Sequence, residues 1–192
     1  MKVCILLGSP RKNGNTAQLL VPFIDEMEKR GNTCQTIWLY DKKVGPCHAC
    51  RACQKDWNSF GCWQEDDVEE IASAVLASDL LIMATPIYAW YCTAPMKMVL
   101  DRFAYGMNKF YTEKKGPALW GGLKAAIITT CGYPVEVGAK VWEDGFKYCC
   151  KHSQLKYMGM LAERQRSYQE VFMTEEKEAR ARAFAASLCE AE

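Results

Sequence analysis

The sequence predicts an α/β protein in which helices cover both faces of a five-stranded parallel sheet. Short, continuous apolar runs alternate along the chain with longer segments whose apolar residues recur at helical spacing. Continuous apolar runs are typical of parallel strands, which are buried on both faces. Because consecutive parallel strands need crossover connections, we expect the intervening helices to lie on the two faces of the sheet.

Five apolar runs are predicted as strands, and the first of them ends at Gly8. In chain order, the strands cover residues 3–7, 33–39, 80–84, 125–130 and 156–161. The first helix follows Asn15 and ends at Gly31, because apolar residues at positions 17, 20, 21, 24 and 27 share one helical face. Later helices are predicted to begin near Asp67, to cover residues 95–103 and about 137–150, and to begin at Thr174.

Composition excludes several classes of protein. The length of 192 residues fits a single domain, interrupted by a polar, Cys-rich stretch at about residues 41–65. Lys and Arg number 24 against 23 Asp and Glu, which argues against a nucleic-acid binder, since such proteins need a basic excess. No apolar run approaches the length of a membrane span, and the N-terminal run is too short for a signal peptide. We expect a cytoplasmic protein whose eleven cysteines are thiols.

The loop after the first strand, residues 8–16, gathers the groups that bind a phosphate monoester. It supplies hydroxyls, side-chain amides, the guanidinium of Arg11 and the N–H groups of a helix N-terminus. It is not a Walker A loop, because no Gly-Lys-Ser/Thr ends it, and it lacks the third glycine of a dinucleotide fingerprint. Cys4 lies seven residues before Arg11, which excludes a Cys-x5-Arg phosphatase loop. The alternative is a plain capped turn with Asn15 as N-cap.

Two more loops follow predicted strands at the same edge of the sheet, where ligands of such sheets bind. The loop of residues 85–93 holds three aromatic residues within four positions. These rings fit either a stacked planar ligand or a dimer interface. In the loop of residues 130–134, Gly132 allows close approach of the backbone to a ring, and its amide can donate to a ring carbonyl. Together the three loops predict a phosphate site beside a site for a planar group.

The segments GSPRKNGNT, ATPIYAWY followed by PMKMVLDRF, and TTCGY resemble the flavodoxin-like NAD(P)H-dependent FMN reductase family. Within that family the chain is similar to the iron–sulfur flavoprotein branch, over roughly residues 2–133. The resemblance implies a three-layer flavodoxin-like fold with strand order 2-1-3-4-5. It also implies FMN as cofactor and NAD(P)H as electron donor.

The resemblance also implies which residues bind FMN. The phosphate is expected to be held by Ser9, Arg11, Asn13, Asn15 and Thr16. The flavin is expected to be flanked by Pro86, Ile87, Tyr88, Trp90 and Tyr91, with Thr130, Cys131, Gly132 and Tyr133 near its pyrimidine edge. No catalytic acid or base is assigned, and His152 is expected at the surface.

The Cys-rich stretch carries a separate signal. Cys47, Cys50 and Cys53 have the spacing C-x2-C-x2-C, and Cys62 follows nine positions later. Three such cysteines and a fourth thiolate can ligate a [4Fe–4S] cluster. Zinc fits less well, because its sites usually pair two separated C-x2-C knuckles, and a metal-free loop is the remaining alternative. The eight-residue gap before Cys62 is longer than is usual in the similar branch.

Two functions follow from these features. The first is an FMN-dependent oxidoreductase that uses NAD(P)H to reduce quinone-, azo-, nitroaromatic or flavin-type acceptors. The alternative is an iron–sulfur flavoprotein that exchanges single electrons with a ferredoxin-like partner, and a phosphate binder without FMN is a third possibility. We also expect a homodimer or homotetramer, because an exposed aromatic set usually marks a contact surface. That set comprises residues 88–91, Tyr105, Phe110, Tyr111 and Trp120.

Overall fold

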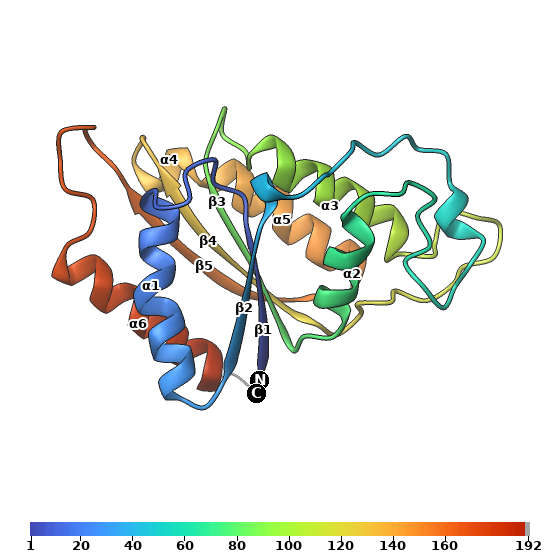
Figure 1. Ribbon diagram of the computed structural model, residues 1–192, viewed down its shortest axis with the longest axis horizontal. Coiled ribbons are helices and arrows are strands. Elements are labelled where there is room, and N and C mark those ends of the chain that lie inside the picture. Colours follow the sequence, from blue (N-terminus) through green and yellow to red (C-terminus); the bar gives the residue numbers. More distant parts are fainter. Residues whose placement is uncertain (191–192) are drawn as a thin grey trace.

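The computed structural model describes residues 1–190 and confirms the predicted parallel sheet (Figure 1). The strands are β1 Lys2–Leu7, β2 Thr33–Trp38, β3 Leu80–Pro86, β4 Lys124–Cys131 and β5 Lys156–Arg164. They pair in parallel in the order β2-β1-β3-β4-β5. This is the flavodoxin-like order that the resemblance implied, and it brings the carboxyl ends of all strands to one edge.

Six helices and two short 3-10 turns complete the described chain. They are α1 Asn15–Lys29, α2 Val68–Leu76, α3 Ala94–Gly106, α4 Val135–Gly138, α5 Lys140–Ser153, α6 Glu175–Glu190, η1 Leu39–Asp41 and η2 Ala52–Gln54. Helices α1 and α6 cover one face of the sheet, and α2, α3 and α5 cover the other (Figure 1). From residue 1 to residue 190, no helix is both long and apolar enough to cross a membrane.

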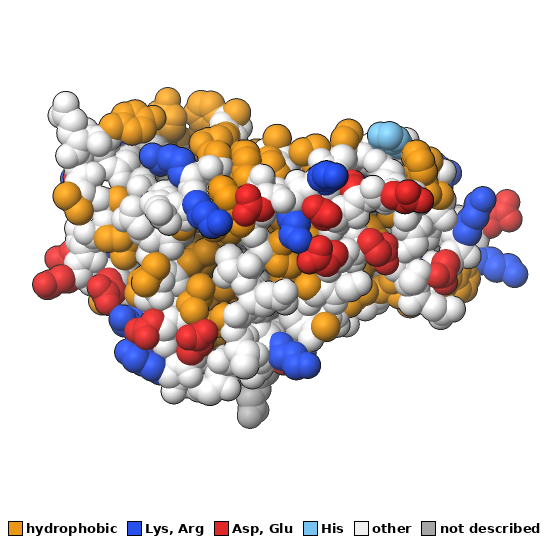
Figure 2. All heavy atoms as spheres, in the orientation of Figure 1, with side chains coloured by type: hydrophobic (Ala, Val, Ile, Leu, Met, Phe, Trp, Pro, Cys, Tyr) orange, Lys and Arg blue, Asp and Glu red, His pale blue; other side chains and the backbone are white. Residues whose placement is uncertain are grey.

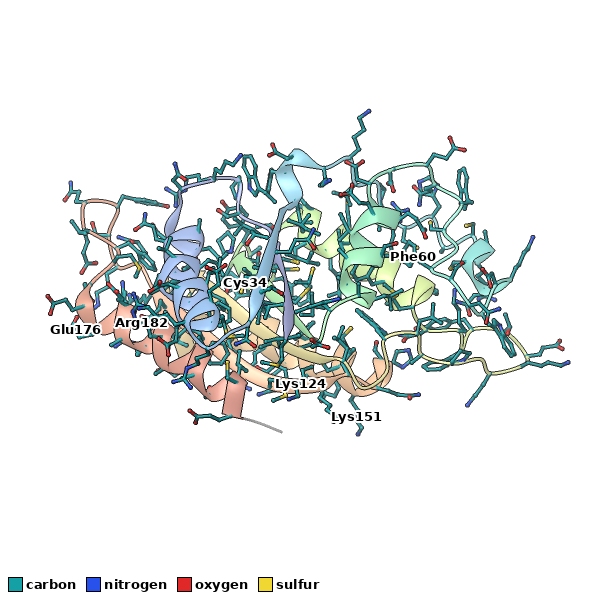
Figure 3. All side chains as sticks on the ribbon, turned by 60° about the horizontal axis from the view of Figure 1, so that its bottom comes forward. Cys34, Phe60, Lys124, Lys151, Glu176 and Arg182 are labelled. Carbon is teal, nitrogen blue, oxygen red and sulfur yellow. The ribbon has the colours of Figure 1, made fainter. Side chains whose placement is uncertain are left out.

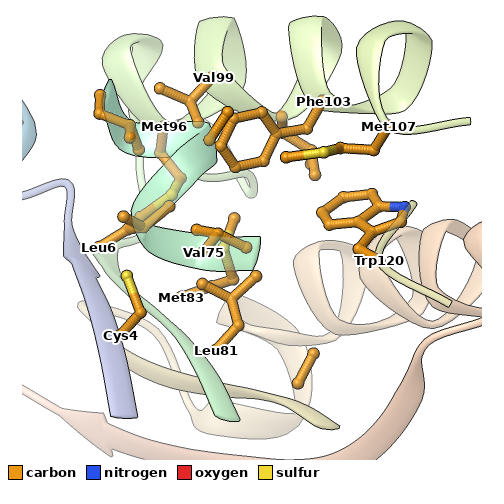
Figure 4. Close-up of a cluster of buried hydrophobic side chains, with 14 of the residues drawn as sticks. Cys4, Leu6, Val75, Leu81, Met83, Met96, Val99, Phe103, Met107 and Trp120 are labelled. Carbon is orange, nitrogen blue, oxygen red and sulfur yellow. The ribbon is translucent and has the colours of Figure 1, made fainter. Parts of the chain in front are cut away.

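Each face of the sheet has its own apolar core. On the first face, Leu19 and Phe23 of α1 pack with Ala181 and Ala185 of α6 over the strands. On the other face, Met96 and other apolar residues of α3 lie along the sheet in one row (Figure 4). Both cores contain the apolar residues whose helical spacing predicted these helices.

The helix predicted over residues 137–150 is in fact two helices, which corrects that expectation. Helix α4 ends at Gly138, and α5 begins only at Lys140. A Cβ atom on Gly138 would lie 3.0 Å from the Cβ of Cys131, so this turn is pressed against the end of β4. The close contact fixes a separate short turn before α5 starts its course along the sheet.

The expected exposed aromatic set is also corrected. Trp120 is only 2% exposed: its Nε1 donates to Asn108 Oδ1 over 2.9 Å, and its ring meets Phe103 edge-on. Tyr105 and Tyr111 are half-buried and pack on each other, with ring centroids 4.6 Å apart. Phe110 is likewise half-buried. His152 is exposed as expected, and its Nε2 lies 2.7 Å from the hydroxyl of Tyr111.

The end of β1 is pressed against the start of α3 at Gly8. The hydroxyl of Thr93 donates to the carbonyl of Gly8 over 2.6 Å. A Cβ atom on Gly8 would lie 2.9 Å from Thr93 Oγ1 and 3.1 Å from Met96 Cβ. Only glycine allows this approach without a shift of α3.

We therefore predict that Gly8→Ala lowers the free energy of unfolding by about 1–3 kcal/mol, the usual cost of overpacking. Urea unfolding followed by circular dichroism measures the change. Gly132→Ala is the matched control, because, apart from its two chain neighbours, no described residue has a heavy atom within 4 Å of a Cβ atom built there. Equal urea midpoints for Gly8→Ala and wild type would contradict this prediction and would show that α3 shifts without a cost in stability.

Candidate functional site

The carboxyl edge of the sheet carries an open pocket, which we call the edge pocket. All three loops singled out in the sequence contribute to it, and so does the loop after β5. Its lining residues are Arg11, Asn15, Pro86, Ile87, Tyr88, Thr130, Cys131, Gly132, Gln165, Arg166, Ser167 and Tyr168. A neighbouring hollow shares Ile87, Tyr88, Cys131, Gly132 and Tyr168 with it and adds Trp90 and Tyr133. The predicted convergence of three loops therefore occurs.

The polar end of the edge pocket is formed by the first loop and the N-terminus of α1. Asn15 is the first residue of α1, and not its N-cap as in the alternative of a plain capped turn; the N-cap is Gly14, and no described side chain caps the helix. The first N–H groups of α1 are thus available to an anion beside Arg11. The buried Thr16 hydroxyl lies 2.8 Å from the hydroxyl of Thr130, which ties α1 to the end of β4.

Three of the five expected phosphate residues, Ser9, Asn13 and Thr16, lie outside the lining of the edge pocket. Ser9 is buried, and its Oγ donates to the carbonyl of Arg11 over 3.0 Å while accepting the Arg11 N–H. It therefore shapes the loop from within. Asn13 is exposed at the outer side of the loop, where its carbonyl accepts a hydrogen bond from the side chain of Gln18.

A tight turn after β3 raises two rings above the pocket. Tyr88 and Tyr91 exchange backbone hydrogen bonds of 2.9 and 3.0 Å, and the two residues between them, Ala89 and Trp90, have φ values of 48° and 63°. This left-handed pattern is typical of a type I′ turn and costs about 1–2 kcal/mol for each non-glycine residue. The turn stacks Trp90 on Tyr133, with centroids 5.5 Å apart.

Tyr91 is placed differently from its neighbours. Its ring packs edge-on against Trp142 in the core, with centroids 5.1 Å apart, so it supports the turn from below. Tyr88 and Trp90 are 51% and 44% exposed and face the pocket region. Of the five residues expected to flank a ring, four line one of the two hollows.

The loop after β4 offers backbone groups and a neutral thiol. Gly132 is exposed, and its carbonyl accepts a hydrogen bond of 3.0 Å from Arg164 Nε. The thiol of Cys131 donates to the carbonyl of Tyr133 over 3.3 Å. Burial raises the pKa of Cys131, so the thiol stays protonated at neutral pH.

Sequence reasoning missed the fourth wall of the edge pocket, the loop of residues 165–168. Gln165 holds this loop, because its Nε2 donates to the carbonyls of Ser167 and Glu170 while its Oε1 accepts a hydrogen bond of 2.9 Å from Asn15 Nδ2. Arg166 and Tyr168 are thereby placed at the mouth of the pocket. The position of the loop could have predicted its role, because it follows β5 at the carboxyl edge where ligands of such sheets bind.

The four predicted metal ligands line a second, smaller pocket, which we call the Cys pocket. It is formed by the Cys-rich stretch against α3, and its lining includes Cys47, Cys50, Cys53 and Cys62. Figure 1 shows this stretch at the end of the molecule opposite α6. Across residues 1–190, no group of three or more Cys, His, Asp or Glu side chains is arranged to hold a metal ion.

Several N–H groups point at the sulfur atoms of the Cys pocket. Ala49 N–H lies 3.4 Å from Cys47 Sγ, Trp63 Nε1 lies 3.0 Å from Cys50 Sγ, and Arg102 Nη2 lies 3.1 Å from Cys62 Sγ. The backbone is left-handed at Ala49 and Arg51, with φ values of 53° and 60°. The stretch thus has two strained backbone positions, and N–H donors from the stretch and from α3 lie around its sulfur atoms.

Known proteins resemble this chain in sequence and in structure. It matches the family model of NADPH-dependent FMN reductases over residues 1–137. It is 33% identical over 172 residues to an iron–sulfur flavoprotein of Archaeoglobus fulgidus, covering 81% of this chain and 77% of that protein. Over 121 residues it is 33% identical to an iron–sulfur flavoprotein of Methanosarcina thermophila, covering 62% of each chain.

Solved structures share the fold at lower identity. An NAD(P)H:quinone oxidoreductase of Methanothermobacter marburgensis superposes with a TM-score of 0.78 at 21% identity, over 98% of this chain and 96% of that chain. An azoreductase superposes with a TM-score of 0.71 at 15% identity, over 98% of both chains. The family match covers more than half of the chain, and the first relative covers more than two thirds of it. The chain therefore belongs to the NADPH-dependent FMN reductase family, in its iron–sulfur flavoprotein branch, and is an NAD(P)H-dependent flavin oxidoreductase with FMN as cofactor.

Proposed function

We propose that FMN binds in the edge pocket and that the protein uses NAD(P)H to reduce small-molecule acceptors of the quinone, azo or flavin type. The observation that carries this proposal is the composition of the pocket. An uncapped helix N-terminus and a guanidinium lie at one end, and an apolar wall with an accessible glycine backbone lies at the other. Such a pocket fits a molecule with a phosphate at one end and a planar ring at the other.

The proposed phosphate contacts come from Arg11, Asn15, Thr16 and the first amides of α1, while Ser9 and Asn13 shape the loop. Bound there, FMN accepts a hydride at N5 and passes electrons on singly or in pairs. On the ring side, Pro86 and Ile87 provide an apolar wall, and the exposed backbone of Gly132 faces the space where a pyrimidine edge would lie.

The rims of the pocket suit a second planar molecule. Tyr88, Trp90 and Tyr133 offer stacking faces, and Tyr168 is 99% exposed opposite them. Arg166 adds a cation at the mouth, which is suited to an anionic donor or acceptor. We therefore place the nicotinamide donor and the acceptor, in turn, between these rings.

The same rims are the proposed contact surface of a homodimer or homotetramer. Hydrophobic side chains gather along the top edge of the molecule, above the ends of β3 and β4 (Figure 2). Exposed apolar patches of this kind mark contact surfaces. We also propose a cytoplasmic location, because all eleven cysteines are free thiols, which suits a reducing compartment.

A second candidate function is electron transfer through an iron–sulfur cluster, and the Cys pocket favours it. Four thiols line one pocket, and an N–H donor lies within hydrogen-bond distance of each of their sulfur atoms. A cubane binds its four thiolates at four separate iron atoms, so its ligands stand further apart than those of one ion. Cys47, Cys50, Cys53 and Cys62 would hold the cluster, which would supply single-electron exchange with a ferredoxin-like partner.

We predict that Arg11→Ala raises the Kd for FMN by about 10- to 100-fold, because it removes a charge-assisted contact worth about 1.5–3 kcal/mol. Fluorescence titration of the apoprotein with FMN measures the change. Lys12→Ala is the matched control, because Lys12 lies over the ring of Trp38 and beside Asp41. Unchanged FMN affinity in Arg11→Ala would refute the phosphate assignment.

We predict steady-state oxidation of NADPH or NADH by the FMN-loaded protein when menadione is the acceptor. Ferredoxin-linked reduction of the same preparation is measured in parallel. In the proposed pocket, NAD(P)H and menadione react in turn with the same FMN ring, so the turnover rate should rise with the fraction of protein that holds FMN. Rapid reduction by ferredoxin without any turnover of a nicotinamide would instead identify an electron carrier.

We predict about four iron and four sulfide per chain in anaerobically purified protein, as expected for one [4Fe–4S] cluster. Cys50→Ser should abolish the broad absorbance near roughly 400 nm that such clusters show, and should leave FMN bound. Cys34→Ser is the control, because Cys34 lies on β2 (Figure 3) and packs against the core under α1 and α6, on the other face of the sheet from the Cys pocket. Flavin-loaded protein that is free of iron would leave a zinc-binding or metal-free loop.

A further inference from the structure

A buried arginine lies against the Cys pocket. Arg102 belongs to α3, lines the pocket, and its side chain is 1% exposed. Its Nη1 forms an ion pair with Asp66, and its Nη2 donates to Cys62 Sγ over 3.1 Å. Its Nε has no hydrogen-bond partner within the part of the chain that the structure describes. The guanidinium therefore has one strong partner, one sulfur partner and one unsatisfied donor.

A purely structural ion pair does not account for this arrangement. Asp66 also accepts hydrogen bonds from the backbone N–H groups of Gly45 and Val68, at 3.0 and 3.2 Å, so its carboxylate is well satisfied. Arg102 is not, because a buried N–H without an acceptor costs about 1–3 kcal/mol. More negative charge at the Cys pocket would satisfy the guanidinium.

A second buried cation bonds to the backbone of the Cys-rich stretch. Lys109 is fully buried, and its Nζ donates to the carbonyls of Cys53 and Phe60 over 2.7 and 3.2 Å. Figure 3 shows Phe60 where the Cys-rich stretch meets α2. One buried cation thus donates to Cys62 Sγ and another to the backbone of Cys53, and both favour negative charge in the Cys pocket.

We propose that Arg102 is a positioning residue for a thiolate-ligated cluster in the Cys pocket, where it orients Cys62 and raises the reduction potential of the cluster. The inference rests on the cluster of the proposed second function. Reduction adds one electron and no proton, so the negative charge at the pocket increases by one. A fixed cation that donates a hydrogen bond to a ligand sulfur stabilises the reduced form, and hydrogen bonds to sulfur are a known determinant of cluster potentials.

The test compares three variants of the anaerobically purified, FMN-loaded protein. Arg102→Met/Asp66→Asn removes the cation together with its carboxylate, so no charge is left unpaired. Arg102→Lys keeps the charge and loses the planar fork. Lys97→Gln is the matched control, because Lys97 forms an exposed ion pair with Asp101 on the same helix. Iron and sulfide content, the cluster midpoint by EPR-monitored titration, and the FMN midpoint are measured for each.

We expect a more negative cluster midpoint in the double variant, a smaller shift in Arg102→Lys and no shift in Lys97→Gln. The FMN midpoint should stay unchanged in all three. A double variant that keeps FMN but no longer assembles the cluster, while Arg102→Lys does, also supports the proposal. If the double variant loses both groups, Arg102→Lys decides through its midpoint.

Two results would overturn the inference, and they differ from each other. Loaded variants whose cluster midpoints equal that of the wild type would show that Arg102 only braces α3, with the proposed cluster intact. Wild-type protein without iron would remove the cluster and this inference together, while the FMN site of the edge pocket would stand.

Discussion

The contact between Gly8 and Thr93 is the constraint on which both pockets depend. It brings the end of β1 and the start of α3 together, with a hydrogen bond of 2.6 Å and no room for a side chain between them. The first loop is thereby set beside the turn after β3, which closes the edge pocket. Helix α3 is anchored at this point and ends, thirteen residues later, against the Cys pocket. One close approach therefore positions both regions.

Four of the five non-glycine residues with left-handed backbones in the described chain lie in the two regions where ligands are proposed to bind. Ala89 and Trp90 adopt left-handed backbone conformations, and so do Ala49 and Arg51. In the turn after β3, the strain is held by paired backbone hydrogen bonds and by Tyr91, which packs on Trp142. The left-handed conformation turns the Trp90 ring away from the strand direction and stacks it on Tyr133. Such outliers persist only where the surrounding structure determines them.

The sequence was informative where a local pattern was decisive. The apolar run before Gly8 and the polar loop after it predict β1 and the polar end of the edge pocket, because both depend on neighbouring residues. Trp120 was misjudged, since its burial depends on Asn108, which accepts its indole N–H. No local pattern reports such a partner.

The remaining differences have the same physical origin. The loop of residues 165–168 carries no glycine and only one aromatic residue, Tyr168, and a hydrogen bond from Asn15, 150 positions earlier, holds it at the pocket. The fate of Tyr91 depends on the left-handed turn, which sends it into the core while its neighbours stay outside. Long-range hydrogen bonds and backbone handedness therefore set the details that periodicity leaves open.

The two pockets stabilise negative charge in different ways, and this difference bears on their proposed occupants. Arg11 at the edge pocket is exposed, so its charge is solvated whether or not an anion is bound. Arg102 and Lys109 are buried beside the Cys-rich stretch, where Arg102 pairs with Asp66 and Lys109 donates to two backbone carbonyls, so water screens their charges little. An exposed cation suits a cofactor that exchanges with solution. Buried cations with an unsatisfied donor suit a permanent occupant, which is how a cluster ligated by four thiolates would differ from FMN.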